Sequence, residues 1–168
     1  MKTVTINKAS QTDLPSIAKL ANDIWREHYT PIIGSEQVEY MLKKYQSVSA
    51  MAEQISDGTF YYSVLLDGTL VGYLSFYPKD GALFLSKIYV SSSLRGKGIG
   101  RQAMEFVIEQ AKTMGFAKIQ LTVNKYNSGS IEAYKRMGFK TVDEVVVDIG
   151  GGFVMDDYVM DLFLNEQK

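Results

Sequence analysis

The chain of 168 residues contains no cysteine and one histidine, His28. The absence of cysteine excludes disulfides, thiolate zinc sites, iron–sulfur clusters and a covalent cysteine acyl-enzyme. A single histidine excludes a multi-histidine metal site and leaves little room for a Ser-His-Asp triad elsewhere. We therefore expect no bound metal and no acyl-cysteine intermediate.

The chain also lacks an excess of positive or negative charge. Lys and Arg number 18 and Asp and Glu 19, which leaves a net charge of -1. This balance argues against a nucleic-acid binder, because such proteins derive most of their affinity from a basic surface. No apolar run reaches the roughly 18–20 residues that span a bilayer, and residues 1–10 do not form a signal peptide. The expectation is a cytoplasmic protein with neither a nucleic-acid nor a membrane partner.

Proline is scarce as well. The three prolines, Pro15, Pro31 and Pro78, lie in the first half of the chain, and no Pro- or Ser-rich hinge divides it. Hydrophobic residues make up 46%, a globular composition, and the length suits one domain. We therefore predict a single domain over residues 1–168.

Hydrophobic periodicity and turn residues predict an alternation of strands and helices. The first helix is expected from about residue 13, capped by Thr12, and Pro31 and Gly34 are expected to break the chain after it. The predicted strands cover 4–6, 59–66, 70–77, 82–90, 118–123, 142–149 and 153–164. The remaining helices are predicted from 35 and over 49–55, 99–114 and 127–137. Antiparallel hairpins beside one β–α–β crossover over 82–123 indicate a mixed α/β (α+β) fold, mostly antiparallel, with six to seven strands and about four helices.

A glycine-rich stretch joins the strand over 82–90 to the next helix. It contains Gly96, Gly98 and Gly100, with basic residues at Arg95, Lys97 and Arg101. Glycines let backbone amides approach a ligand closely, and a helix N-terminus carries unpaired N–H groups and a partial positive charge. The stretch therefore suits a phosphate or a pyrophosphate.

Two common glycine loops do not match this spacing. A P-loop needs Gly-Lys-Ser/Thr, but here Gly98 is followed by Ile99. A dinucleotide-binding loop would place its third glycine at Arg101, and its acidic residue at the end of the next strand, where Asn124 stands. A coenzyme A pyrophosphate loop and an ordinary tight helix N-terminus remain.

A second group of residues follows the next predicted strand. Asn127, Ser130 and Tyr134 are three and four residues apart, so they share one face of the predicted helix. A tyrosine hydroxyl directed inward from that helix can donate a proton or a hydrogen bond. The alternative is a core aromatic with its hydroxyl at the rim.

Together these two stretches resemble the GNAT (Gcn5-related N-acetyltransferase) family. The pattern Arg/Gln-x-x-Gly-x-Gly/Ala is matched by Arg95, Gly98 and Gly100. The pattern Asn-x-x-Ser/Ala-x-x-x-Tyr-x-x-x-Gly-Phe is matched by Asn127, Ser130, Tyr134, Gly138 and Phe139. The resemblance covers residues 82–139.

The resemblance implies that acetyl-CoA lies in a wedge between two splayed parallel strands, 82–90 and 118–124. It implies that backbone groups of Ile88 and Val90 hold the pantetheine arm and that residues 95–100 hold the pyrophosphate. The cofactor-binding residues implied in this way are Ile88, Tyr89, Val90, Arg95, Gly96, Lys97, Gly98, Ile99, Gly100, Arg101, Asn127, Ser130 and Tyr134.

The resemblance also implies catalytic roles. The amide of Val90 would stabilise the oxyanion, and Tyr134 would protonate the leaving thiolate. Where many relatives carry a glutamate on the central strand, this chain has Ser86 followed by Lys87, so we expect deprotonation through ordered water or by a residue from elsewhere. Candidate bases are His28, Asp157 and Tyr158, whereas Asn124 would orient the amine or a water.

The acceptor side is less specified. Residues that could line it are Trp25, Tyr29, Gln37, Tyr40, Tyr77 and Tyr158. Asp156 and Asp157 could attract a cationic amine such as a polyamine. The predicted function is transfer of an acetyl group from acetyl-CoA to a primary amine of a small molecule, by direct attack in a ternary complex. The alternatives are acetylation of peptide or protein N-termini and a non-catalytic CoA-binding regulatory module, and analogy with the family allows a homodimer.

Overall fold

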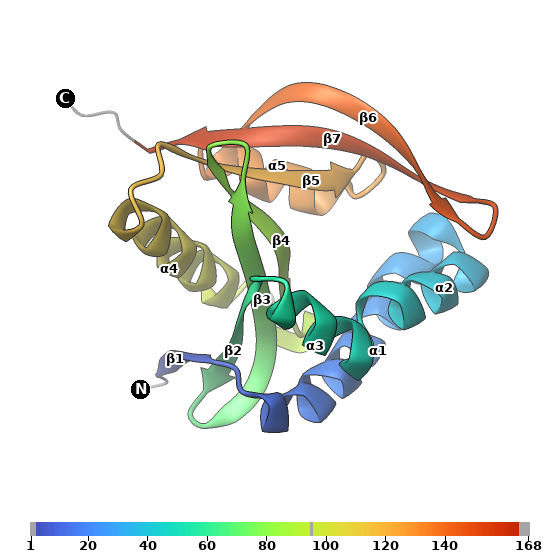
Figure 1. Cartoon of the computed structure of the whole chain (residues 1–168), viewed down its shortest axis with the longest axis horizontal. Coiled ribbons are helices and arrows are strands. Elements are labelled where there is room, and N and C mark those ends of the chain that lie inside the picture. The colour runs from blue at the N-terminus through green and yellow to red at the C-terminus, as the bar shows by residue number, and fades with distance from the viewer. Residues whose placement is uncertain (1–2, 95, 165–168) are drawn as a thin grey trace. The chain divides into compact units, whose positions relative to one another are not determined.

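The computed structural model describes residues 3–94 and 96–164 of the chain (Figure 1). Within these residues the helices are α1 (Leu14–Ile33), α2 (Ser35–Tyr45), α3 (Val48–Ser56), α4 (Ile99–Thr113) and α5 (Ser128–Arg136). The strands are β1 (Val4–Lys8), β2 (Phe60–Leu66), β3 (Thr69–Lys79), β4 (Ala82–Val90), β5 (Lys118–Asn124), β6 (Lys140–Gly150) and β7 (Phe153–Phe163). Two short 3-10 turns, Gln11–Asp13 and Ser92–Leu94, precede α1 and α4.

The strands form one sheet in the order β1-β2-β3-β4-β5-β7-β6. Strand β4 pairs parallel with β5 through Leu83↔Ile119 and Phe84↔Gln120, whereas β1–β2, β2–β3, β5–β7 and β6–β7 are antiparallel. The predicted mixed, mostly antiparallel fold is therefore confirmed. The described residues form five α-helices, one at each of the five stretches where a helix was predicted.

The boundaries of α1 differ from the expectation at both ends. Pro31 does not break the chain, because it lies inside α1, which continues to Ile33. Proline has no backbone N–H, so Pro31 removes one helical hydrogen bond. The last turn still closes, because Gly34 N donates to Thr30 O at 2.9 Å. The helix ends at Gly34, whose φ of 88° favours glycine. At the other end, a 3-10 turn that follows Ser10 replaces the predicted Thr12 cap.

Contacts divide the chain into two compact units. The first unit comprises Met1–Tyr77 and Lys87–Val107, and the second comprises Pro78–Ser86 and Ile108–Lys168. The prediction of a single domain stays a prediction. No helix in the described part of the chain combines the length and the apolar character that a membrane span requires.

The first unit is built on the apolar stripe that the sequence predicts for α1. Ile17 and Ala21 are fully buried there, and Ile24 is 4% exposed, in agreement with helical spacing. Val38 of α2 and Met51 of α3 are also fully buried. The amphipathic faces of these three helices therefore supply much of the core of this unit.

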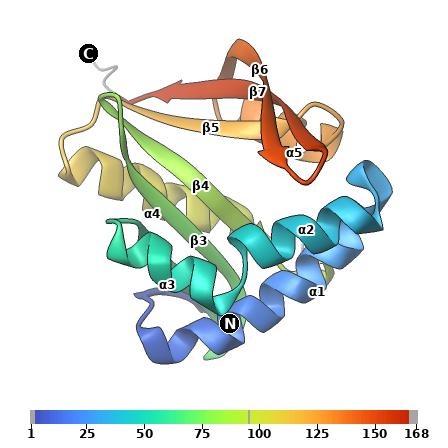
Figure 2. The same ribbon diagram turned by 45° about the vertical axis from the view of Figure 1, so that its right-hand side comes forward.

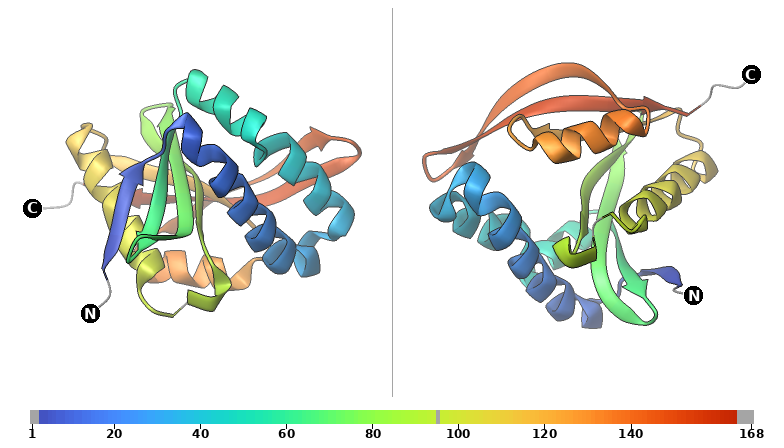
Figure 3. Two further views of the ribbon diagram at one scale, coloured as in Figure 1. Left: turned by 90° about the horizontal axis from the view of Figure 1, so that it is seen from below. Right: turned by 180° about the vertical axis from the view of Figure 1, so that it is seen from behind.

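In the second unit, β5, β7 and β6 lie side by side and α5 covers one face of them (Figures 2 and 3). Side chains alternate along β5, with Ile119, Leu121 and Val123 buried on one face. A Cβ at Gly138, two residues after α5, would lie 3.2 Å from Leu162 Cδ1, so α5 packs on the same face as Leu162. The opposite face carries the polar residues of β5, which are Lys118, Gln120, Thr122 and Asn124.

Candidate active site

The N-terminus of α4 is lined by glycines, as the sequence predicts. Gly96 and Gly98 have φ values of 78° and 82°, which residues with a Cβ rarely adopt. Gly98 O accepts the helical hydrogen bond from Gln102 N at 3.0 Å, so α4 starts directly after Gly98. A Cβ placed at Gly96, Gly98 or Gly100 would meet no atom within 4 Å. The backbone here lies open to a ligand.

The charges around this helix start suit an anion. The side chains of Lys97 and Arg101 are exposed, whereas Ile99 is only 3% exposed and anchors the first turn in the core. A helix N-terminus adds a partial positive charge and amides without intrahelical partners. The described part of the loop therefore fits a diphosphate, although Arg95 lies outside the described residues.

Gly72 of β3, which the sequence analysis did not single out, packs against the end of β4 that carries the predicted site residues Tyr89 and Val90. A Cβ at this position would lie 2.4 Å from Tyr89 O and 3.3 Å from Val90 Cα, so only glycine allows β3 to approach the end of β4. Ser91 N then donates to Val71 O at 2.8 Å. A glycine inside an otherwise apolar, β-branched and aromatic strand was the available signal.

The side chain of Tyr89 belongs to an aromatic cluster. Its ring centroid lies 5.3 Å from Tyr73, 5.8 Å from Trp25 and 6.4 Å from Tyr29. The His28 ring stands edge-on to Tyr29 at 4.8 Å. The structure thus brings His28 and Tyr89, two of the predicted site residues, to one cluster around Tyr29.

Lys87, the residue that stands near the usual position of the base, is buried. Its Nζ donates to Tyr45 O at 2.5 Å, to Gln54 Oε1 at 3.1 Å and to the Tyr61 hydroxyl, all within the first unit. Burial lowers the pKa of Lys87 to about 7. Three acceptors favour the charged ammonium, but no carboxylate compensates its loss of water, so burial dominates.

In the second unit, Asn124 and Asn127 shape the turn from β5 into α5. Asn124 Oδ1 accepts a hydrogen bond from Tyr126 N at 2.8 Å, and Asn124 O accepts one from Asn127 N at 3.0 Å. Asn127 is 3% exposed, and its carbonyl accepts the first helical bond, from Ile131 N. The predicted site residue Asn124 thus uses its side-chain oxygen in an Asx turn.

Tyr134 and Ser130 lie on α5, each half-buried. The Tyr134 ring packs 5.7 Å from the ring of Phe139, and Tyr134 O accepts the hydrogen bond from Phe139 N at 3.0 Å. The Gly-Phe pair of the second motif therefore ends the helix and supports the tyrosine ring. Ser130 and Tyr134 have the predicted helical spacing on α5, whereas Asn127 is the residue before the helix.

Two adjacent aspartates on β7 have different surroundings. Asp156 forms an ion pair with Lys125, whose Nζ lies 3.0 Å from Asp156 Oδ1 and 2.7 Å from Glu144 Oε1. Asp157 is 5% exposed, and burial, with a smaller contribution from Asp156, raises its pKa to about 6. A carboxylate that titrates near neutrality can both bind an ammonium group and exchange a proton.

A hollow of about 660 Å³ lies on the first unit, lined by α1, α2 and the start of α3. Arg26 and Glu39, which are ion-paired to each other, and Tyr40 contribute to its wall. Tyr40 is the only predicted acceptor residue among its lining residues within the described chain.

The β–α–β crossover, the glycine-lined start of α4 and Tyr134 on the next helix agree with a coenzyme A-dependent acyltransferase. Residues 17–139 match the family model described as the acetyltransferase (GNAT) family, and the chain belongs to this family. The predicted enzyme class and acyl donor are therefore confirmed: the protein is an acetyl-CoA-dependent N-acetyltransferase.

Similar proteins align with nearly the whole chain. An uncharacterised N-acetyltransferase from the pepI 3′ region of Lactobacillus delbrueckii subsp. lactis is 24% identical and aligns with 99% of this chain and 98% of its own length. The spermidine N(1)-acetyltransferase of Thermoplasma acidophilum is 23% identical over 91% of this chain and 96% of its own. The crystal structure of the PaiA N-acetyltransferase from Thermoplasma acidophilum in complex with coenzyme A has a TM-score of 0.82 and 22% identity, covering 96% and 99% of the two chains.

Proposed function

We propose that this enzyme acetylates a primary amine of a small cationic molecule, a polyamine or an amino-acid-like compound. The observation that supports the acceptor class is the similarity to a spermidine N(1)-acetyltransferase along 91% of the chain. The near-neutral charge of the chain and its buried carboxylate at Asp157 agree with a small cationic acceptor better than with a polyanionic one.

In this proposal the donor is held mainly by backbone groups. Main-chain atoms of Ile88 and Val90 bind the pantetheine arm, and the α4 N-terminus from Gly96 to Arg101 binds the diphosphate. The open space around Gly96, Gly98 and Gly100 supports this assignment, because phosphate oxygens need to reach the amides. Asn127 and Ser130 contribute from α5.

The reaction proceeds by direct attack in a ternary complex. The neutral amine attacks the thioester carbonyl, the Val90 amide stabilises the oxyanion, and the C–S bond breaks as Tyr134 protonates the thiolate. An oxyanion donor contributes about 10²–10³ in rate and a general acid about 10²–10⁴. A chain without cysteine has no cysteine nucleophile for an acyl-enzyme, which supports the direct route.

The experiment is an acceptor panel of polyamines, amino acids and peptides, read by release of free thiol from acetyl-CoA. We expect polyamines or amino acids to give the highest kcat/KM. Preference for peptides would replace the small-molecule acceptor with a polypeptide N-terminus. Tight coenzyme A binding without turnover on any acceptor would contradict the proposal and favour a regulatory module.

Replacement of Tyr134 by phenylalanine tests the proposed acid. Y134F is expected to lower kcat by about 10²–10⁴-fold, because the thiolate must leave unprotonated, with little change in the dissociation constant of coenzyme A. The matched control is Tyr126→Phe, which removes the hydroxyl of a tyrosine that is 72% exposed just before α5. If Y134F keeps the wild-type kcat, Tyr134 is a packing residue and not the general acid.

A further inference from the structure

Two buried carboxylates on one face of β7 differ in their partners. Asp157 and Asp161 are four residues apart, so they share a face roughly 13 Å apart along the strand, and they are 5% and 3% exposed. Asp161 accepts a hydrogen bond from Gln120 Nε2 at 2.9 Å and pairs with Lys118 Nζ at 3.2 Å. None of the residues that the structure describes donates a hydrogen bond to the Asp157 carboxylate.

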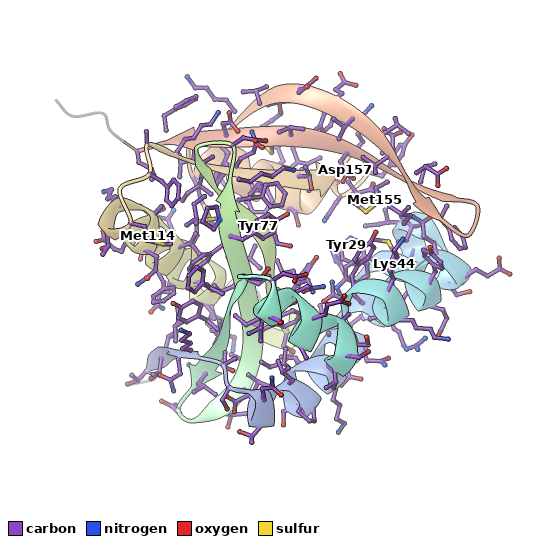
Figure 4. The ribbon with its side chains drawn as sticks, in the orientation of Figure 1. Tyr29, Lys44, Tyr77, Met114, Met155 and Asp157 are labelled. Carbon is purple, nitrogen blue, oxygen red and sulfur yellow. The ribbon has the colours of Figure 1, made fainter. Side chains whose placement is uncertain are left out.

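The position of Asp157 in the sheet is fixed by pairing on both sides. It lies opposite Asn124 of β5 and opposite Val145 of β6. The alternation of side chains places it with Asn124 and Thr122, on the face that α5 does not cover. Figure 4 shows Asp157 and Met155 on the same side of β7. Asp157 therefore stands at the end of β5, beside the turn that leads into the Tyr134 helix.

The charged groups nearby do not neutralise Asp157. On its own face along the three strands, the charged groups are the Asp161–Lys118 pair, the exposed Lys140 opposite Asp161, and Asp143 of β6, whose Oδ1 accepts a hydrogen bond from Glu144 N. On the other face, Lys125 is engaged by Asp156 and Glu144 and lies 5.6 Å over the Tyr158 ring. Lys125, which follows the residue that pairs with Asp157, is thus committed to other carboxylates.

A buried carboxylate without donors is costly, and proteins usually supply it with an Arg, a Lys or several N–H groups, as Lys118 and Gln120 of β5 do for Asp161. A molecule that binds beside Asp157 can supply the missing donors. An ammonium group meets this need, because it brings three N–H donors and a positive charge. A neutral or anionic group would leave the carboxylate uncompensated.

We propose that Asp157 binds the ammonium group of the acceptor and takes one proton from it before acetyl transfer. This assignment rests on the proposed function and names its base. The amine then has a lone pair with which it forms the C–N bond, while the C–S bond breaks. The second proton leaves the nitrogen to water as the bond forms, Tyr134 delivers its proton to the thiolate and recovers one from water, and Asp157 returns its proton to water. The net change is an ammonium and a thioester converted to an amide, a free thiol and one proton.

The test compares Asp157→Asn with Asp161→Asn, using the best acceptor of the panel. D157N is expected to lower kcat/KM for the amine by about 10²–10⁴-fold and to leave the dissociation constant of coenzyme A unchanged. D161N, which removes an equally buried but fully partnered carboxylate on the same face, is expected to keep the KM of the amine. Equal effects of the two variants would overturn the proposal.

The pH profile separates a base from a packing residue. With a carboxylate that accepts the proton, wild-type kcat/KM rises near pH 6 and then levels off, because the protonated amine is the form that binds. D157N depends on amine that is already neutral, so its kcat/KM is expected to keep rising toward the amine pKa of about 10. Asp157→Glu keeps a carboxylate and is expected to restore the plateau. If D157N is too unstable to assay, loss of the plateau in D157E would overturn the proposal.

The failures of the two proposals are distinguishable. A wild-type chain that acetylates no amine overturns the proposed function, and this inference with it. A wild-type chain that acetylates amines with no plateau near neutral pH, or a D157N variant with wild-type kinetics, overturns the role of Asp157 alone.

Discussion

Lys87 and Asp157 are both buried ionisable side chains on strands, one in each compact unit, and they differ in what surrounds them. Both are 5% exposed, and burial shifts the pKa of each toward neutrality, to about 7 for Lys87 and about 6 for Asp157. Lys87 is met by three acceptors of its own chain. Asp157 is met by no donor of the described residues.

The acceptors around Lys87 show what a buried charge with hydrogen-bond partners contributes to the fold. The carbonyl of Tyr45 ends α2, Gln54 belongs to α3, and Tyr61 belongs to β2, so one ammonium group ties two helices to the strands of the first unit. The Tyr61 hydroxyl also donates to Gln54 Oε1, which completes the network. A buried charge that finds its hydrogen-bond partners within its own chain stabilises the fold, whereas a buried charge without such partners is available to bind a ligand.

The largest effect is expected from Lys87→Ala. This change removes the donor of three buried acceptors and leaves a cavity, so it is expected to lower the free energy of unfolding by about 3–5 kcal/mol. Denaturant unfolding of K87A beside Lys112→Ala, an exposed lysine in the last turn of α4, measures the difference. A loss as small as that of the Lys112 control would mean that Lys87 does not hold the helices.

Asp157→Asn is expected to raise the free energy of unfolding, whereas Lys87→Ala is expected to lower it. The folded pKa of about 6 lies above the usual value of 3.8, so the folded state holds the proton more tightly and wild-type stability falls as pH rises between these values. D157N removes this penalty and is expected to stabilise the free protein by about 2 kcal/mol at pH 8, and by little below about pH 4. Thermal unfolding at the two pH values measures it. A D157N variant that is destabilised at pH 8 would show that the carboxylate has partners in the fold.

Measured over one pH unit, the smallest effect is a slope in stability above neutral pH. The folded pKa of Lys87, about 7, lies below the usual 10.5, so between these values the unfolded state holds a proton that the folded state has released. Wild-type stability is therefore expected to increase with pH by about 1 kcal/mol per pH unit just above neutrality, and to lose this increase as pH falls through 7. Lys87→Met, measured by denaturant unfolding at two pH values, should lack the slope. An identical slope in both proteins would assign it to another group.

Much of the architecture could be predicted from local sequence. Asp67-Gly68 predicts the β2–β3 hairpin, and both residues have positive φ values, 51° and 83°, as such a turn requires. Strand β4 and the start of α4 have the predicted bounds, because β-branched residues and glycines mark them directly. Pro31 misled the prediction because a proline near a helix end removes little that the helix needs.

The site was only partly predictable for a physical reason. Motif spacing identified the glycine loop and the Tyr134 helix, since both depend on local backbone geometry. The candidate bases His28, Asp157 and Tyr158 could not be ranked in this way. Burial and hydrogen-bond partners depend on residues far apart in the chain, such as Asn124 and Val145 on either side of Asp157.

The sequence alone thus determined the order of elements, the family and the motif residues, because hydrophobic period, turn chemistry and glycine spacing are local properties. Only the tertiary structure decided that Gly72 lets β3 meet the end of β4, that Lys87 is fully partnered and that Asp157 is not. These are properties of neighbours brought together by folding, and a carboxylate acquires its function from the donors that surround it or fail to do so.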